Sequence, residues 1–277
     1  MEWKKLKSLI ILILLVVNGF LLVLVASRRE ESVRYERTAL EQTVQVLRRG
    51  GIEVDLDAVA PADGLVPMSV DRDLEREALL ARTLLDEPVE GDNRGGGLYL
   101  YRGELGEVSI RSGGELSAEF GEDGRWSTDR PERHAADLLK KLGVEGVQTG
   151  VTEEDGQTTV RFRQNWNGAA VFTCEAAFVY RGGRLCTLSG TLIMAEAGTA
   201  EAGQALTVPT ALMRFSEEIA GTGDVCSRLR SMEAGYRGTA QTLSGGAKLV
   251  PVWLVSTDTA NYYLDCATGA LTRLTDQ

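Results

Sequence analysis

The chain has 277 residues and is acidic, with 30 lysines and arginines against 40 aspartates and glutamates and a formal net charge of −10. Residues 1–29 hold five basic residues and one acidic residue, so the rest of the chain carries a net charge of −14. This charge argues against nucleic acid as a partner, because phosphate backbones are bound through lysine and arginine. The part after residue 29 is long enough for one large domain or two small ones.

An uncharged apolar run, SLIILILLVVNGFLLVLVA, extends from residue 8 to residue 26. A helix of about 20 residues crosses the hydrocarbon core of a bilayer, so we predict a transmembrane helix over 8–27. The alternative is a cleaved signal peptide, whose apolar core would be about 7–15 residues long. The run is longer than that, and Val25-Ala26-Ser27 is a poor match to a cleavage site.

The charges at the two ends of this run predict its orientation. Lysines precede it and arginines follow it, namely Lys4, Lys5, Lys7, Arg28 and Arg29. Basic residues favour the cytoplasmic side, and long domains translocate largely regardless of charge. We therefore expect a single-pass protein of the cell membrane, with residues 1–7 as a cytoplasmic tail and the C-terminal domain outside. Trp3 and the three lysines are expected to anchor the helix at the inner interface.

Asn18 is the one strongly polar side chain inside the apolar run. A polar amide is costly in hydrocarbon unless a partner satisfies it. A hydrogen bond between two helices would contribute roughly 0.6–2 kcal/mol, and Gly19 would let a second backbone approach closely. We therefore predict that Asn18 and Gly19 bind a partner helix. The alternative is that insertion simply tolerates a single asparagine.

Residues 28–50 predict a juxtamembrane helix, with a thin apolar stripe and a stop at Gly50-Gly51. A first subdomain is predicted over 51–128. Its helix is expected over 71–86, and the segment LYLYRGELGEVSIRSGGELSAEF is typical of three antiparallel strands.

A second subdomain is predicted over 129–277. Helices are expected over 131–142 and 208–220, each with a proline at its start. Between them, Asp155-Gly156, Asn167-Gly168 and Gly182-Gly183 are typical hairpin turns joining four strands. The predicted fold class is therefore α+β, with two similar-sized subdomains of antiparallel meanders and packed helices.

The four cysteines contain no C-x-x-C pair, which argues against a zinc site or a thioredoxin-type site. If Gly182-Gly183 form a two-residue turn, residue 179 faces Cys186, and Cys174 lies on the opposite face of the hairpin. We therefore expect mostly buried, unpaired thiols at Cys174, Cys186, Cys226 and Cys266. Disulfides remain the alternative for a domain outside the cell.

Nothing in the sequence predicts an enzyme, a metal site or a cofactor. His134 is the single histidine and is expected on an exposed helix face, without the orienting partner that a general base requires. Motifs such as H-E-x-x-H and G-x-S-x-G do not occur. Trp166 and Asn167 could bind a glycan or peptide by stacking, but we favour a hairpin whose aromatic ring packs on the sheet.

Several blocks spread over nearly the whole chain resemble the YycI-like regulatory proteins of Gram-positive bacteria. They are MEWKKLKSLIILILLVVNGF, RRGGIEVD, LYLYRGELGEVSIRSGGELSAEF, NWNGAAVFTCEAAFVYRGGRL, SGTL, ALMRF, EAGYRG and VPVWLVSTDTANYYLDCATGAL. The last block also resembles a PepSY-like strand–turn–strand unit.

This resemblance implies a single-pass membrane regulator. Its implied partners are a YycH-type membrane protein, the WalK sensor histidine kinase and the lipid bilayer. WalK, together with WalR, controls cell-wall metabolism, and the modulation of the kinase is usually inhibitory. The alternative function is an anchored domain that binds or processes envelope material such as peptidoglycan.

Overall fold

The computed structural model of the protein describes the backbone of residues 2–121, 126–195, 197–241 and 245–275. Within these ranges it describes all side chains except those at 2–6, 8–10, 12, 23–34 and 36.

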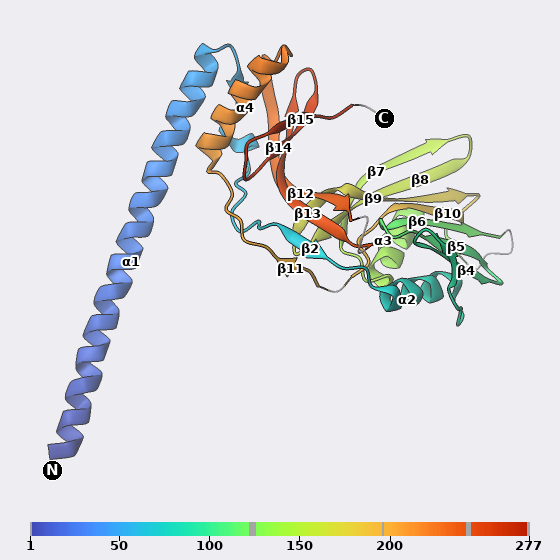
Figure 1. The fold of residues 1–277 in the computed structure, drawn as a ribbon, viewed down its shortest axis with the longest axis horizontal. Coiled ribbons are helices and arrows are strands. Elements are labelled where there is room, and N and C mark those ends of the chain that lie inside the picture. Colours follow the sequence, from blue (N-terminus) through green and yellow to red (C-terminus); the bar gives the residue numbers. More distant parts are fainter. Residues whose placement is uncertain (1, 122–125, 196, 242–244, 276–277) are drawn as a thin grey trace.

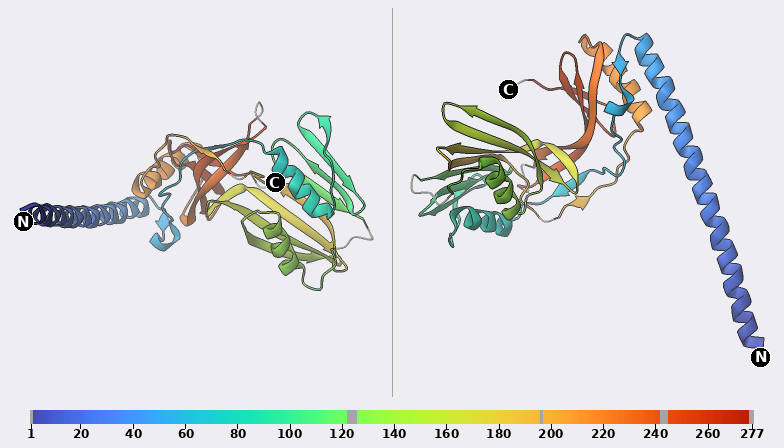
Figure 2. Two further views of the ribbon diagram at one scale, coloured as in Figure 1. Left: turned by 90° about the horizontal axis from the view of Figure 1, so that it is seen from below. Right: turned by 180° about the vertical axis from the view of Figure 1, so that it is seen from behind.

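Helix α1 (Glu2–Arg49) is one continuous helix of 48 residues. It projects from the rest of the protein and touches it only near its C-terminal end (Figure 1; Figure 2). Gly51, with φ of 88°, ends the helix as predicted. The amide of Ile52 donates to the carbonyl of Leu47 and the amide of Gly51 to that of Arg48, the hydrogen-bond pattern of a Schellman motif.

The rest of the fold repeats one unit three times: a helix followed by four antiparallel strands. The first helix–meander unit comprises α2 (Leu74–Leu85), β3 (Asp92–Gly95), β4 (Leu98–Gly103), β5 (Gly106–Ile110) and β6 (Glu115–Phe120). The second comprises α3 (Pro131–Lys141), β7 (Gly146–Glu154), β8 (Gln157–Trp166), β9 (Ala169–Arg181) and β10 (Arg184–Thr191). The third comprises α4 (Val208–Thr222), β12 (Arg228–Ala240), β13 (Ala247–Thr257), β14 (Asn261–Asp265) and β15 (Leu271–Arg273).

The predicted hairpin turns of the second unit are confirmed. Both residues of each turn have positive φ, with values of 51° and 74° at Asp155-Gly156 and 49° and 81° at Asn167-Gly168. Gly182-Gly183 shows the same pattern, with 55° and 77°. Two consecutive positive φ values define the turn type whose twist matches that of the flanking strands.

The first two units join edge to edge, because β6 pairs with β10 in antiparallel fashion. Their eight strands therefore run in the order β3-β4-β5-β6-β10-β9-β8-β7. Helices α2 and α3 share one apolar core with this sheet, in which Leu84, Val108, Leu138 and Phe178 are at most 1% exposed.

The third unit has its own core, built around Leu212, Phe215, Trp253 and Tyr262. It connects to β9 through β12, in a parallel pairing of only two residues on each strand. Three short strands complete the sheet. They are β1 (Glu53–Val54), parallel to β12, β2 (Met68–Val70), paired with β13, and β11 (Thr199–Ala200), paired with β2.

The predicted α+β class with two similar-sized subdomains of antiparallel meanders is wrong. The described strands contain 100 of the 277 residues, well above the 20–25% of an average globular protein. All 15 strands of the described residues belong to one mixed sheet, with parallel pairs at β1–β12 and β9–β12. Alternating residues and turns identify each hairpin locally, but the pairings that merge the meanders join strands distant in the chain.

The prediction of a transmembrane helix over 8–27 also needs correction. Among the residues that the structure describes, no helix is long and apolar enough to cross a membrane. Residues 8–27 instead form the N-terminal part of a helix that continues without a break to Arg49. The proposed boundaries of the tail, the juxtamembrane helix and the two subdomains remain predictions.

Candidate interaction surface

The projecting part of α1 carries a concentrated apolar surface. Its exposed apolar side chains are Ile11, Ile13, Leu14, Leu15, Val16, Val17, Phe20, Leu21 and Leu22, with exposures from 47% to 72%. We call residues 11–22 the apolar segment of α1. Removing apolar surface from water contributes roughly 25 cal/mol per Å². Contiguous exposed apolar patches of this kind mark sites of interaction.

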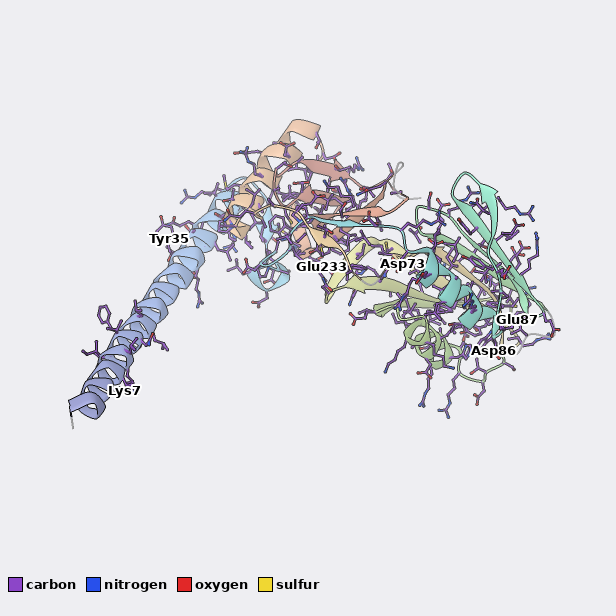
Figure 3. All side chains as sticks on the ribbon, turned by 60° about the horizontal axis from the view of Figure 1, so that its bottom comes forward. Lys7, Tyr35, Asp73, Asp86, Glu87 and Glu233 are labelled. Atoms are coloured by element: carbon purple, nitrogen blue, oxygen red, sulfur yellow. The ribbon has the colours of Figure 1, made fainter. Side chains whose placement is uncertain are left out.

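Asn18 and Gly19 both lie inside the apolar segment and are exposed. A Cβ atom added at Gly19 would meet no atom within 4 Å, so the helix surface there is open to a neighbouring backbone. Lys7 is also exposed, and it points away from the helix near its N-terminal end (Figure 3). The side chains of Trp3, Lys4 and Lys5 lie outside the described residues, so their anchoring role stays a prediction.

The opposite end of α1 is packed against the third unit. Val44 and Leu47, which are 6% and 1% exposed, belong to the same core as Leu212 and Phe215 of α4. Thr43 is buried with them, and its hydroxyl donates to the carbonyl of Ala39 at 2.9 Å. The helix therefore has a fixed end on the sheet domain and a free apolar end.

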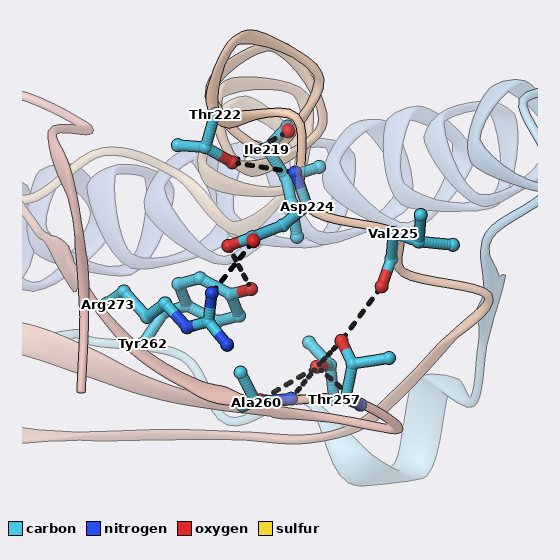
Figure 4. Close-up of polar contacts among 9 residues, drawn as sticks. Ile219, Thr222, Asp224, Val225, Thr257, Ala260, Tyr262 and Arg273 are labelled. Atoms are coloured by element: carbon cyan, nitrogen blue, oxygen red, sulfur yellow. Dashed lines mark hydrogen bonds and ion pairs between the residues drawn. The ribbon is translucent and has the colours of Figure 1, made fainter. Parts of the chain in front are cut away.

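A polar cluster ties the C-terminal end of α4 to the last strands of the third unit (Figure 4). The Tyr262 hydroxyl donates to Asp224 Oδ2 at 2.8 Å, and Arg273 Nη1 contacts Asp224 Oδ1 at 2.9 Å. The Thr259 hydroxyl donates to the carbonyl of Val225 at 2.8 Å. Burial and the Asp224 carboxylate both raise the pKa of Tyr262, so its proton stays in this hydrogen bond. The cluster therefore fixes α4, and with it α1, on the sheet.

No sequence motif pointed to this cluster, because Tyr262 and Arg273 lie 38 and 49 residues from Asp224. The docked face of α1 could be predicted from the sequence, because Val44 and Leu47 are three residues apart and therefore lie on one helix face. The spacing did not say which helix would cover that face.

His134 is half-buried rather than exposed as expected. Its Nδ1 lies 2.8 Å from the hydroxyl oxygen of Tyr180. Its ring centroid lies 5.7 Å from those of both Trp126 and Tyr180. Burial, followed by the positive charge of Lys141, lowers the pKa of His134, and burial raises that of Tyr180. The histidine is thus a packed part of the core of the first two units.

The structure favours the packing interpretation of the QNWNG segment. Trp166 is 7% exposed and packs in an apolar cluster with Val171 and Tyr236. Asn167 is the first residue of the hairpin turn, where its positive φ is required.

The four cysteines are free thiols. The predicted pairing of residue 179 with Cys186 is wrong: Val179 pairs with Thr187, and Cys186 lies in a bulge between the paired residues Leu185 and Thr187. Burial raises the pKa of Cys174 and Cys266 to about 12 each, so both remain protonated near neutral pH. In the described part of the chain, no group of three or more histidines, cysteines, aspartates or glutamates could hold a metal ion.

No protein-family model matches the sequence, and no curated protein matches it either. Among solved structures, the C-terminal domain of Bacillus megaterium YpeB is similar, with a TM-score of 0.38 and 11% sequence identity. The match covers 75% of this chain and 100% of that domain. A likeness at this level supports no statement about family or function.

Proposed function

We propose that this protein is a regulator at the cell membrane that acts by protein–protein contact, with its sheet domain outside the cell. Its targets are a sensor histidine kinase that controls cell-wall metabolism and a YycH-type partner protein, and the expected effect on the kinase is inhibition. The observation that carries this proposal is the exposed apolar segment of α1. The resemblance of the sequence blocks to YycI-like proteins supports the choice of partners.

The apolar segment is suited to contact with partner helices. Its side chains would leave water on binding, and Asn18 would gain a partner across the interface. A regulator of this kind shifts a two-state kinase by binding its inactive arrangement more tightly than its active one. A tenfold shift requires a difference of only about 1.4 kcal/mol, within reach of one or two interhelical contacts.

The fixed end of α1 gives the sheet domain a part in this regulation. Because Val44 and Leu47 are buried against α4, a partner that holds the sheet domain also constrains the direction of α1. The YycH-type partner would thus position the helix, and the apolar segment would contact the kinase.

The test replaces residues 8–26 by an unrelated apolar sequence of equal length. We expect the variant to lose its effect on kinase autophosphorylation while the sheet domain stays folded. A domain that binds or processes envelope material would keep its activity after this exchange. The proposal would be contradicted if the variant still bound peptidoglycan and if the wild-type protein had no effect on kinase autophosphorylation.

A point substitution tests the same contact more finely. Asn18→Leu should reduce co-purification with the kinase or the YycH-type partner about 3- to 30-fold, the equivalent of roughly 0.6–2 kcal/mol. Leu15→Ile, a volume-conserving exchange in the same exposed segment, is the matched control. Unchanged co-purification of Asn18→Leu would show that this amide takes no part in assembly.

A further inference from the structure

A groove lies beside the fixed end of α1, between that helix, β1 and the start of β12. Two adjoining depressions form it and share Glu53, Arg228 and Arg230 in their linings. Arg48, from the last turn of α1, lines the first depression, and Asp258 lines the second. We call this feature the β12 groove.

The sheet has a local gap in this groove. On one side, β1 pairs only with Arg228 and Leu229, and the next contact to β12 is the bridge between Val59 and Met232. Between these points the chain forms a short 3₁₀ helix, Leu56–Ala58, instead of continuing as a strand. On the other side, the register with β13 shifts between Leu229 and Ser231. Arg230 is therefore the extra residue of a bulge, a device that redirects a side chain and leaves its backbone unpaired.

The carboxylates of the groove are already engaged. Glu53 accepts hydrogen bonds from Arg228 at 2.7 and 3.2 Å, and Asp55 accepts from the amide of Asp57 at 3.1 Å. Asp258 accepts from the hydroxyl of Ser227 at 2.6 Å and from two backbone amides. These donors, led by the Ser227 hydroxyl, lower the pKa of Asp258 to about 2.

Two arginines of the groove have no such partner. Arg48 and Arg230 are both exposed, and in the described part of the chain neither forms an ion pair or a hydrogen bond through its guanidinium. A guanidinium is always charged and offers five donors in a planar fork that matches a carboxylate. The groove therefore presents two guanidinium groups whose donors are free, whereas each of its carboxylates already accepts at least one hydrogen bond.

We propose that the β12 groove binds an acidic peptide segment of a partner protein, with carboxylates held by Arg48 and Arg230. An acidic segment fits because Arg48 and Arg230 line the same depression and neither guanidinium has a counter-ion among the described residues. Leu56, which is 39% exposed, adds an apolar contact beside the two arginines. This site is separate from the apolar segment, which lies at the other end of α1.

The probe is a fluorescein-labelled ten-residue peptide of alternating glutamate and valine, titrated into the full-length protein and followed by fluorescence anisotropy. Alternation places every carboxylate on one face of an extended chain. We expect binding that weakens between 50 and 500 mM salt, because exposed charges are screened. Arg230→Gln and Arg48→Gln should each weaken binding about fivefold, as expected for one exposed ion pair.

Arg49→Gln is the matched control, because Arg49 is exposed and adjacent to Arg48 but does not line the groove. It should leave the affinity unchanged, and a peptide with glutamine in place of glutamate should not bind. Thermal unfolding of each variant checks the fold, and Arg230→Lys, which keeps the charge without the fork, should give an intermediate affinity. The proposal is overturned if the wild-type protein does not bind the glutamate peptide, or if Arg49→Gln weakens binding as much as Arg230→Gln. Capture by vesicles containing phosphatidylglycerol, with the same dependence on Arg48 and Arg230, would assign the groove to lipid and also overturn it.

Discussion

The first two helix–meander units share one large apolar core, whereas the third unit is joined to them through a short parallel strand pairing and two smaller apolar clusters. Five residue pairs connect β6 with β10, and α2 and α3 share a single core. Only Gly235 and Tyr236 of β12 pair with Ala170 and Val171 of β9, and the third unit keeps a core of its own. We call these four residues the junction. The continuous sheet thus carries two main cores and two bodies, of which one is formed by the first two units and the other by the third unit with the docked end of α1.

Small apolar clusters reinforce the junction without merging the two cores. Phe172 of β9 stacks on Tyr263 of β14, with ring centroids 6.0 Å apart. Arg163 of β8 forms an ion pair with Glu233 of β12 at 2.8 Å and lies over the Phe172 ring. These contacts set the relative direction of the two bodies.

The largest expected effect tests whether the two cores are independent. Phe215→Ala removes a fully buried ring from the core of the third unit and should reduce its stability by about 3–5 kcal/mol. Hydrogen exchange in moderate urea should then show the third unit opening while the other two remain protected. Phe178→Ala, in the shared core of the first two units, should give the reverse pattern. A single transition covering all three units in both variants would contradict the comparison.

A somewhat smaller effect is expected where α1 meets the third unit. Leu47→Ala leaves a cavity beside α4 and should cost about 2–3 kcal/mol. Limited proteolysis should then cleave the loosened end of α1 while the sheet stays resistant. Val46→Ala, at a residue that is 50% exposed, should change stability by less than about 0.5 kcal/mol. Equal effects of the two substitutions would mean that the docked face has been misassigned.

The junction itself can be weakened without touching either core. A side chain at Gly235 would collide with the carbonyl oxygen of Ala170 and the ring of Phe172, so Gly235→Val should cost about 1–3 kcal/mol. Small-angle X-ray scattering should show a broader range of arrangements of the two bodies. Gly221→Ala, where an added Cβ meets no atom within 4 Å, should leave the scattering unchanged. Unchanged scattering for Gly235→Val would show that the clusters alone hold the bodies together.

The smallest expected effect is a dependence of stability on pH that is confined to the first two units. Because burial lowers the pKa of His134, the folded protein binds a proton there less readily than the unfolded chain, whose histidine titrates near 6.5. Stability of the first two units should therefore fall as pH drops below about 6.5, until the folded histidine also titrates. Thermal unfolding between pH 7.5 and 5 measures this decrease, and His134→Phe should remove that part of it. A His134→Phe protein with the same pH dependence would assign the decrease to the carboxylates.

Local sequence patterns predicted the individual elements well. The turns at 155–156, 167–168 and 182–183 identified three hairpins in the sequence. Two consecutive residues with positive φ are usually Asp-Gly, Asn-Gly or Gly-Gly, and these pairs occur at the three turns. Pro131 and Pro209 correctly placed the starts of α3 and α4. Helix α2 was predicted from residue 71 and begins at Leu74. The side chain of Asp73 caps it by accepting a hydrogen bond from the amide of Arg76.

The assembly of these elements could not be read in the same way. The edge pairing of β6 with β10 depends on residues about 70 positions apart. The four residues of the junction belong to no sequence motif that would predict their pairing. The apolar segment of α1 was evident from the sequence, whereas the β12 groove was not. Arg230 lines the groove because it is the extra residue of a bulge, and the sequence around Arg230 contains no pattern that predicts a bulge.

Because α1 is long, a small change of its angle at the docked end produces a large displacement at its N-terminal end. At about 1.5 Å per residue, the 29 residues between position 15 and Val44 span roughly 44 Å. A tilt of about 5° where α1 rests on α4 would therefore move the middle of the apolar segment sideways by roughly 4 Å, about half of the 8–10 Å that separates the axes of packed helices. Small changes of packing around Val44 and Leu47 would thus become a sideways displacement of several ångströms at the far end of the helix.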